Sequence, residues 1–130
     1  MQNARWIVVI EDHPEHLDFI ATLLRRAGYR VAPFRAARAA LAHVERSAVD
    51  LVITDVFMPE IDGFEVLRAL QALRPDLPLI AVSGAASPDP VHFLGSIKSL
   101  GAREVLMKPI DAAALLAAVA NILAAGPGGH

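Results

Sequence analysis

Five short, mostly apolar runs of residues, each followed by a segment with helical spacing, constrain the fold of this chain more than any other feature. The runs lie at residues 6–10, 29–34, 51–54, 79–82 and 104–107. Polar and apolar residues do not alternate strictly in them, which is typical of strands that are buried on both faces. The sequence therefore predicts five strands at the centre of the molecule.

The segments between the runs place apolar residues three or four positions apart, as an amphipathic helix does. Gly28 and Gly101 follow two of these segments where helices often end, and Asp111 is expected to cap the last helix. The expected helices cover residues 17–27, 36–46, 64–73, 91–100 and 111–125. This alternation predicts an α/β fold with a doubly wound parallel sheet, covered by helices on both faces.

Length and composition fit one such domain and exclude several kinds of protein. The chain has 130 residues, the size of a single domain, and no cysteine for disulfides or thiolate metal sites. Its net charge of -2 provides no basic excess for a polyanion, so we expect no nucleic-acid binding by this domain.

Neither the first apolar run nor the last expected helix is long enough for a signal peptide or a membrane span of ~20 residues. We therefore expect a cytoplasmic protein without membrane contact. Its domain is expected at residues 1–125, and residues 126–130 are expected to form a flexible tail or the start of a linker.

Polar side chains follow the ends of four expected strands. Glu11 and Asp12 follow the first strand, Asp55 the third, Ser83 the fourth and Lys108 the fifth. Ligands bind beyond the carboxyl ends of the strands in doubly wound sheets, and neighbouring strands lie only ~4.8 Å apart. Three carboxylates close together need a cation, and oxygen ligands without His or Cys favour Mg²⁺, or Mn²⁺, over zinc.

The order and placement of these motifs resemble the receiver domain of two-component response regulators, over residues 6–123. The resemblance rests on Glu11-Asp12, on the run DVFMPEIDG at residues 55–63, on Ser83-Gly84, and on Gly101-Ala102 ahead of LMKP at residues 106–109. It implies a flavodoxin-like sheet with strand order 2-1-3-4-5. It also implies a signalling phosphoacceptor that catalyses only its own phosphorylation and dephosphorylation.

The resemblance assigns a role to each polar residue. Asp55 is the phosphoacceptor, and its phosphoryl group comes from a sensor histidine kinase or a phosphotransfer protein. Lys108 pairs with Asp55 and then with the phosphoryl oxygens, while Ser83 donates its hydroxyl to the phosphoryl group.

The resemblance also implies a metal site. Asp12, Asp55 and the backbone carbonyl of Phe57 would ligate Mg²⁺, and Glu11 would hold the ion through water.

Three positions depart from the family pattern. Val105 stands where many receivers carry an aromatic switch residue, so that switch cannot operate here. Phe57 and Ala85 stand where polar side chains orient a hydrolytic water, so we expect a long-lived phosphoryl group.

Two other functions remain open from the residues: an adaptor that works by protein contact alone, and a Mg²⁺-dependent phosphohydrolase. The hydrolase would need a second acid two residues after Asp55, where Phe57 stands. His13 and His16 lie near the acid pair, and the solvated-surface interpretation is favoured for both.

The last expected helix is almost entirely apolar. Between residues 111 and 123 only Asp111 and Asn121 are polar, and a helix that is apolar all round is normally buried or held in an interface. We expect docking or a homodimer through this helix, with contacts from Leu116, Val119, Leu123 or their neighbours.

Overall fold

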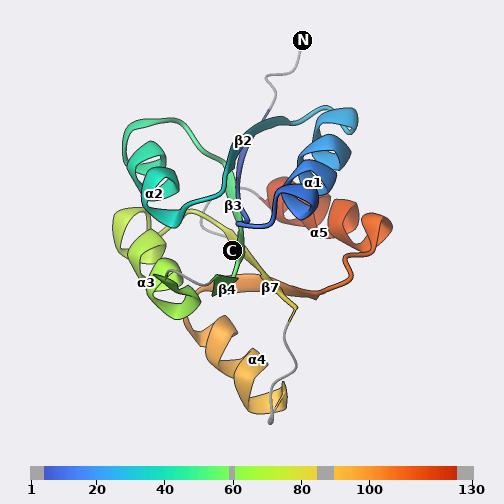
Figure 1. The fold of residues 1–130 in the computed structure, drawn as a ribbon. Coiled ribbons are helices and arrows are strands. Elements are labelled where there is room, and N and C mark those ends of the chain that lie inside the picture. Colours follow the sequence, from blue (N-terminus) through green and yellow to red (C-terminus); the bar gives the residue numbers. More distant parts are fainter. Residues whose placement is uncertain (1–4, 59–60, 85–89, 126–130) are drawn as a thin grey trace.

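A five-stranded parallel sheet forms the centre of the protein, as the computed structural model shows for residues 5–58, 61–84 and 90–125 (Figure 1). Its strands are β1 (Trp6–Ile10), β2 (Arg30–Phe34), β3 (Leu51–Asp55), β6 (Leu79–Ser83) and β7 (Ala102–Met107). Their order is β2-β1-β3-β6-β7, and every neighbouring pair is parallel. This confirms the predicted order 2-1-3-4-5. The tail expected at residues 126–130 and Ala85 lie outside the described residues.

Five helices cover the two faces of this sheet. They are α1 (Pro14–Arg26), α2 (Ala37–Arg46), α3 (Gly63–Leu73), α4 (Pro90–Ser99) and α5 (Ala112–Ala125). Figure 1 shows α1 and α5 together on one face and α2 and α3 on the other. Successive residues of a strand point to opposite faces, so Ile7 and Val9 join the core beneath α1 and α5, while Val8 and Ile10 join the other core.

The helix ends follow the local chemistry of the sequence. Gly28 and Gly101 have φ angles of +100° and +105°, a conformation that glycine adopts without steric cost. The Asp111 carboxylate accepts a hydrogen bond of 2.8 Å from the backbone N–H of Ala114, which confirms the predicted cap. Helix α1 begins at Pro14, three residues before its predicted start, because proline is well suited to a first helical turn.

A second, two-stranded antiparallel sheet was not predicted from the sequence. It consists of β4 (Phe57–Met58) and β5 (Ile61–Asp62), and Phe57 pairs with Asp62. Strands of two residues carry no periodicity that could reveal them.

Helix α5 corrects the contacts that were expected for a dimer. Leu115, Val119 and Leu123 are buried against the sheet, so Val119 and Leu123 cannot contribute to an outer surface and that part of the prediction was wrong. Leu116 is half-buried, and the exposed positions of the helix are mainly alanines.

No helix in the described ranges combines the length and the hydropathy that a membrane span requires.

Candidate functional site

The carboxyl ends of the strands bring the predicted polar residues to one edge of the sheet, called here the carboxyl edge. Asp55 is the last residue of β3 and is paired with Val82, next to Ser83 at the end of β6. The backbone N–H of Lys108 donates a hydrogen bond of 2.9 Å to the carbonyl of Ser83. Glu11 directly follows β1 in the same way. Parallel pairing in register therefore gathers residues that are up to 97 positions apart in the chain.

Three carboxylates form a cluster at this edge. Glu11, Asp12 and Asp55 each offer an oxygen atom, and these atoms lie within 4.8 Å of one another. Glu11 is only 1% exposed and Asp55 only 4% exposed. Buried carboxylates are costly unless positive charge or hydrogen bonds compensate them. The all-oxygen donor set therefore fits a hard divalent cation such as Mg²⁺.

Lys108 supplies one positive charge to this cluster. Its ammonium nitrogen lies 3.0 Å from Asp55 Oδ2 and 3.0 Å from Glu11 Oε1. Burial lowers the pKa of Lys108, but the hydrogen bonds and charges of Glu11 and Asp55 outweigh burial, so the pKa is raised overall. The side chain is therefore a stable cation, yet a single ammonium cannot balance three carboxylates.

Ser83 provides a further polar group, whose hydrogen-bonding capacity is unused. Its side chain is fully buried, and its hydroxyl oxygen has no hydrogen-bond partner among the described residues. Leaving a buried hydroxyl unpaired costs about 1–3 kcal/mol. Such a group is expected where a ligand completes the hydrogen bonding.

Comparison with known proteins identifies the family of this fold and cluster. The sequence model of the response regulator receiver domain matches residues 7–120. The chain belongs to this family. Receiver domains act as signalling domains in two-component systems, and the predicted recognition is thereby confirmed.

Individual relatives agree with this assignment. The chain is 33% identical over 113 residues to the regulatory protein VanRc of Enterococcus gallinarum, covering 87% of this chain and 47% of VanRc. It is 35% identical over 118 residues to the transcriptional regulatory protein ZraR of Escherichia coli K12, covering 91% of this chain and 26% of ZraR. This receiver domain thus spans less than half the length of either relative.

A solved structure shows the same architecture. The crystal structure of a CheY-like receiver domain protein from Methanospirillum hungatei superposes with a TM-score of 0.86 at 28% identity, covering 94% of this chain and 95% of that chain.

Gly84 explains how the lysine of this receiver domain reaches its partners. A Cβ atom placed on Gly84 would lie 2.9 Å from the Lys108 Cδ atom, which is too close for an ordinary contact. The absence of a side chain therefore lets the Lys108 stem run over the end of β6. The sequence motif contained this glycine, but the reason for it becomes visible only in three dimensions.

Two of the three positions where the sequence departs from the family pattern lie among the described residues, and their surroundings differ. Val105 is half-buried and packs against the core beneath α2 and α3. The backbone of Phe57 lies in β4, two residues beyond Asp55, and the role expected for its carbonyl stays a prediction.

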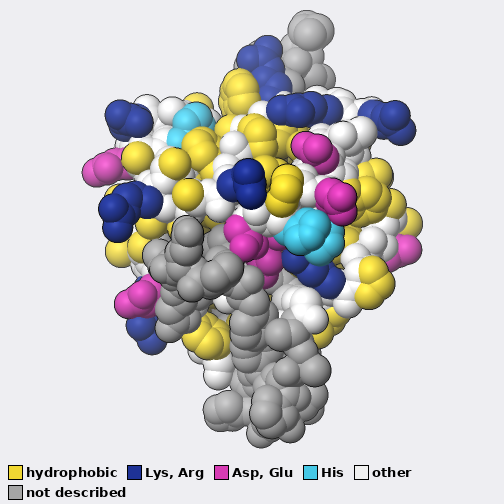
Figure 2. Space-filling view, in the orientation of Figure 1, with side chains coloured by type: hydrophobic (Ala, Val, Ile, Leu, Met, Phe, Trp, Pro, Cys, Tyr) yellow, Lys and Arg dark blue, Asp and Glu magenta, His cyan; other side chains and the backbone are white. Residues whose placement is uncertain are grey.

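His16 is a residue of the site that sequence reasoning missed. Its Nδ1 atom lies 3.1 Å from the Lys108 ammonium nitrogen and 3.9 Å from Glu11 Oε2, and its ring stacks on that of His13 with centroids 4.2 Å apart. His16 is exposed, as the solvated-surface interpretation expected, but its contact with Lys108 was not predicted. Pro14 was the available signal, because a helix that begins there turns His16 back toward the acid pair. On the face drawn in Figure 2, acidic side chains lie beside histidine side chains.

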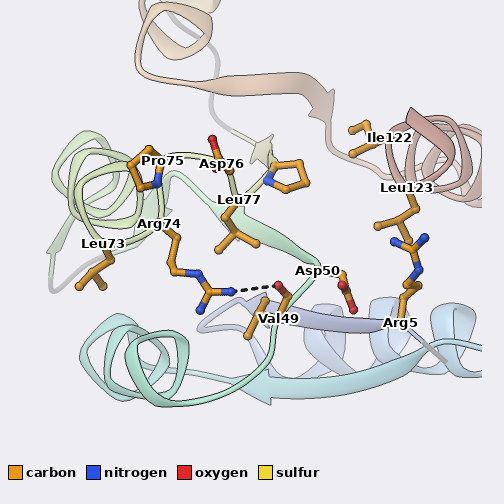
Figure 3. A pocket seen from close by; sticks show the side chains of 11 residues that line it. Arg5, Val49, Asp50, Leu73, Arg74, Pro75, Asp76, Leu77, Ile122 and Leu123 are labelled. Carbon is orange, nitrogen blue, oxygen red and sulfur yellow. Dashed lines mark hydrogen bonds between the residues drawn. The ribbon is translucent and has the colours of Figure 1, made fainter. Parts of the chain in front are cut away.

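A separate cavity of about 380 Å³ lies at the amino ends of the strands, the amino edge of the sheet (Figure 3). The Arg74 guanidinium on its wall donates hydrogen bonds to three backbone carbonyls, those of Val44, Ser47 and Val49, at 3.0, 3.3 and 3.5 Å. The Asp50 carboxylate accepts a hydrogen bond of 2.8 Å from the backbone N–H of Trp6. Both charged groups thus serve the backbone, and their geometry indicates a structural role.

Proposed function

We propose that this receiver domain accepts a phosphoryl group on Asp55 from a histidine kinase or a phosphotransfer protein, in a Mg²⁺-dependent reaction. The observation that carries the proposal is the placement of the Lys108 ammonium 3.0 Å from Asp55 Oδ2, beside the acidic cluster. The proposal includes a cytoplasmic location, as expected from the sequence.

The reaction is a phosphoryl transfer between two nucleophiles. A carboxylate oxygen of Asp55 forms a bond to phosphorus while the bond between phosphorus and the donor imidazole nitrogen breaks, and the product is an acyl phosphate. Lys108 already faces the carboxylate and would pair with the oxygens of the transferred group. Positioning and charge neutralisation are the main requirements of such a transfer.

The acidic cluster is the proposed site of the metal. Asp12, Asp55 and the backbone carbonyl of Phe57 would hold Mg²⁺, with Glu11 acting through water. When bound, the ion would stabilise negative charge on the transferring oxygens.

Ser83 is proposed to connect phosphorylation to the surface of the domain. Its unpartnered hydroxyl would donate a hydrogen bond to the phosphoryl group. A shift of the end of β6 toward that group would bias the connection to α4, because a new charge can select one of two packed arrangements. Val105 has no ring that could follow this movement.

A homodimer or a docked partner on α5 is the second part of the proposal. Because Val119 and Leu123 are buried in the domain, the contacts would come from half-buried Leu116 and the exposed alanines around it. Ala117→Glu is expected to abolish self-association in sedimentation experiments without lowering phosphorylation.

The phosphoacceptor is tested with acetyl phosphate and Mg²⁺, with the intact mass as the readout. The wild-type chain is expected to gain one phosphate, and Asp55→Asn is expected to gain none. Asp50→Asn is the matched control, because Asp50 is also a carboxylate next to β3 but is half-buried at the amino edge of the sheet.

Two results would contradict the proposal. A wild-type chain that takes up no phosphate would favour the adaptor function. Continuous release of inorganic phosphate from many donor molecules would favour the phosphohydrolase.

A further inference from the structure

Lys108 has three partners in the structure, and only two of them are carboxylates. Its ammonium nitrogen lies 3.0 Å from Glu11 Oε1, 3.0 Å from Asp55 Oδ2 and 3.1 Å from His16 Nδ1. An ammonium group carries three N–H donors and no acceptor. The contacts with Asp55 and His16 have hydrogen-bond geometry, and the contact with Glu11 is an ion pair.

The contact with His16 has a definite requirement. An ammonium group can only donate, so this contact is a hydrogen bond when His16 Nδ1 supplies its lone pair. The His16 side chain is 48% exposed, so the rest of its ring is open to water.

The imidazole differs from the other two partners in one important respect. Glu11 and Asp55 belong to the acidic cluster, so a divalent cation would compete with Lys108 for their oxygens, and a phosphoryl group on Asp55 would change the partners of Lys108. An imidazole nitrogen is not an oxygen ligand, whereas a hard cation prefers oxygen ligands. The hydrogen bond from Lys108 to His16 is therefore the contact that can persist when the carboxylates change partners.

The position of His16 in the fold makes this contact well defined. The residue lies in the first turn of α1, which begins at Pro14, and its ring stacks on His13 with an interplanar angle of 20°. On the other side, the Lys108 stem is confined above Gly84. The first turn of α1 and the residue that follows β7, 92 residues apart in the chain, thus meet at this hydrogen bond.

We propose that His16 is a positioning residue for phosphorylation, whose imidazole Nδ1 holds the Lys108 ammonium against Asp55. This inference rests on the proposed function, because it assigns a partner to the lysine that would bind the phosphoryl group.

The first measurement tests the hydrogen bond without any phosphorylation. The chain has two lysines, Lys98 and Lys108, and Lys98 is exposed on α4. The exchange of the lysine ammonium protons with water is monitored by ¹⁵N-edited NMR without divalent cations. This exchange is expected to be slower for Lys108 than for Lys98. His16→Leu is expected to speed the Lys108 exchange, and His16→Asn is expected to preserve most of the protection because Asn can place an acceptor near the position of Nδ1.

The second measurement separates positioning from metal binding. His16→Leu is expected to lower the maximal rate of phosphorylation by acetyl phosphate about threefold to tenfold, the effect of losing one hydrogen bond of ordinary strength. The Mg²⁺ concentration for half-maximal rate is expected to stay within about twofold of the wild-type value, because His16 is not a metal ligand in this scheme. His16→Asn should recover most of the maximal rate.

His13→Leu is the matched control, because it removes a neighbouring imidazole and keeps an apolar group over His16. It is expected to behave like the wild type in both measurements. Urea unfolding of each variant verifies that the fold is intact.

The outcomes distinguish this inference from the proposed function. Equal exchange and equal maximal rates in His16→Leu and the wild type would overturn the positioning role, and so would equal losses in the Leu and Asn variants. A wild-type chain that cannot be phosphorylated would instead overturn the proposed function, and with it any role of His16 in that reaction.

Discussion

The two edges of the central sheet each hold a partly buried cation with three neighbouring acceptor atoms. They differ in how much charge and hydrogen-bonding capacity remains unsatisfied. At the amino edge, Arg74 donates to three neutral carbonyls, one in the last turns of α2 and two in the connection between α2 and β3. At the carboxyl edge, Lys108 faces two carboxylates and an imidazole.

The remaining capacity for interaction lies at the carboxyl edge. There, two of the three clustered carboxylates share one ammonium, and the Ser83 hydroxyl has no partner among the described residues. At the amino edge, Arg74 and Asp50 are both engaged by the backbone. The burial of charged groups therefore does not by itself indicate function: unbalanced charge and an unpaired hydroxyl indicate a ligand, whereas satisfied groups indicate a structural role.

Removing the cation of the carboxyl edge should have the largest effect on phosphorylation. Lys108→Met is expected to lower the rate of phosphorylation by acetyl phosphate about a hundredfold or more, because it removes a positive group aimed at developing negative charge. The rate is measured by intact mass over time, with Lys98→Met as the control on exposed α4. A rate for Lys108→Met within a few-fold of the wild-type rate would mean that Lys108 at the carboxyl edge and Arg74 at the amino edge do not differ in function.

Removing the cation of the amino edge should affect stability and leave phosphorylation unchanged. Arg74→Met is expected to lower the free energy of unfolding by about 2 kcal/mol, because three carbonyls lose a charged donor. The urea midpoint reports this change, and the exposed Arg68 on α3 provides the control variant Arg68→Met. A large loss of phosphorylation in a folded Arg74→Met variant would contradict the structural role.

Relieving the repulsion within the acidic cluster should separate stability from activity. Asp12→Ala is expected to abolish Mg²⁺-dependent phosphorylation and to raise the free energy of unfolding by about 1 kcal/mol without divalent cations, because like charges no longer crowd the carboxyl edge. Unfolding is compared with that of Asp18→Ala, which alters an exposed carboxylate on α1. Full phosphorylation of Asp12→Ala in the presence of a chelator would refute the metal site.

The smallest expected effect concerns pH. The pKa of Lys108 is raised above its ordinary value of 10.5 in the folded state, so its contribution to stability is complete below that pH and is lost as the pH rises through the folded pKa. The wild type should therefore lose stability at strongly alkaline pH relative to Lys108→Met. Arginine stays protonated in this range, so Arg74→Met should run parallel to the wild type. If the free energy of unfolding depended on pH in the same way for the wild type and both variants, the two edges would not differ in their response to alkaline pH.

The sequence predicted the fold and the polar residues of the carboxyl edge because both follow from strand position. Asp55 and Ser83 end buried strands, and parallel pairing alone brings such residues together. The contact of His16 with Lys108 was missed because it depends on where α1 begins and joins residues far apart in the chain.

Helix α5 illustrates a different limit of prediction. Because nearly all of its residues are apolar, no periodicity distinguishes the inner from the outer face, and Val119 and Leu123 were assigned to the wrong one. The small sheet of β4 and β5 was also missed, because its strands are too short to leave a pattern.

The link between the end of β6 and Lys108 has a consequence for the entropy of binding. The backbone of Lys108 is hydrogen-bonded to Ser83, and its stem lies against Gly84, so the ammonium and the serine hydroxyl belong to one connected piece of structure. Two donors that are already tied together lose little freedom when they engage the same anion. A tetrahedral oxyanion bound here would thus be recognised by a prearranged pair of donors. Weakening the hydrogen bond to Ser83 or the contact with Gly84 should lower the affinity for the anion, because the two donors would be less ordered even though both remain.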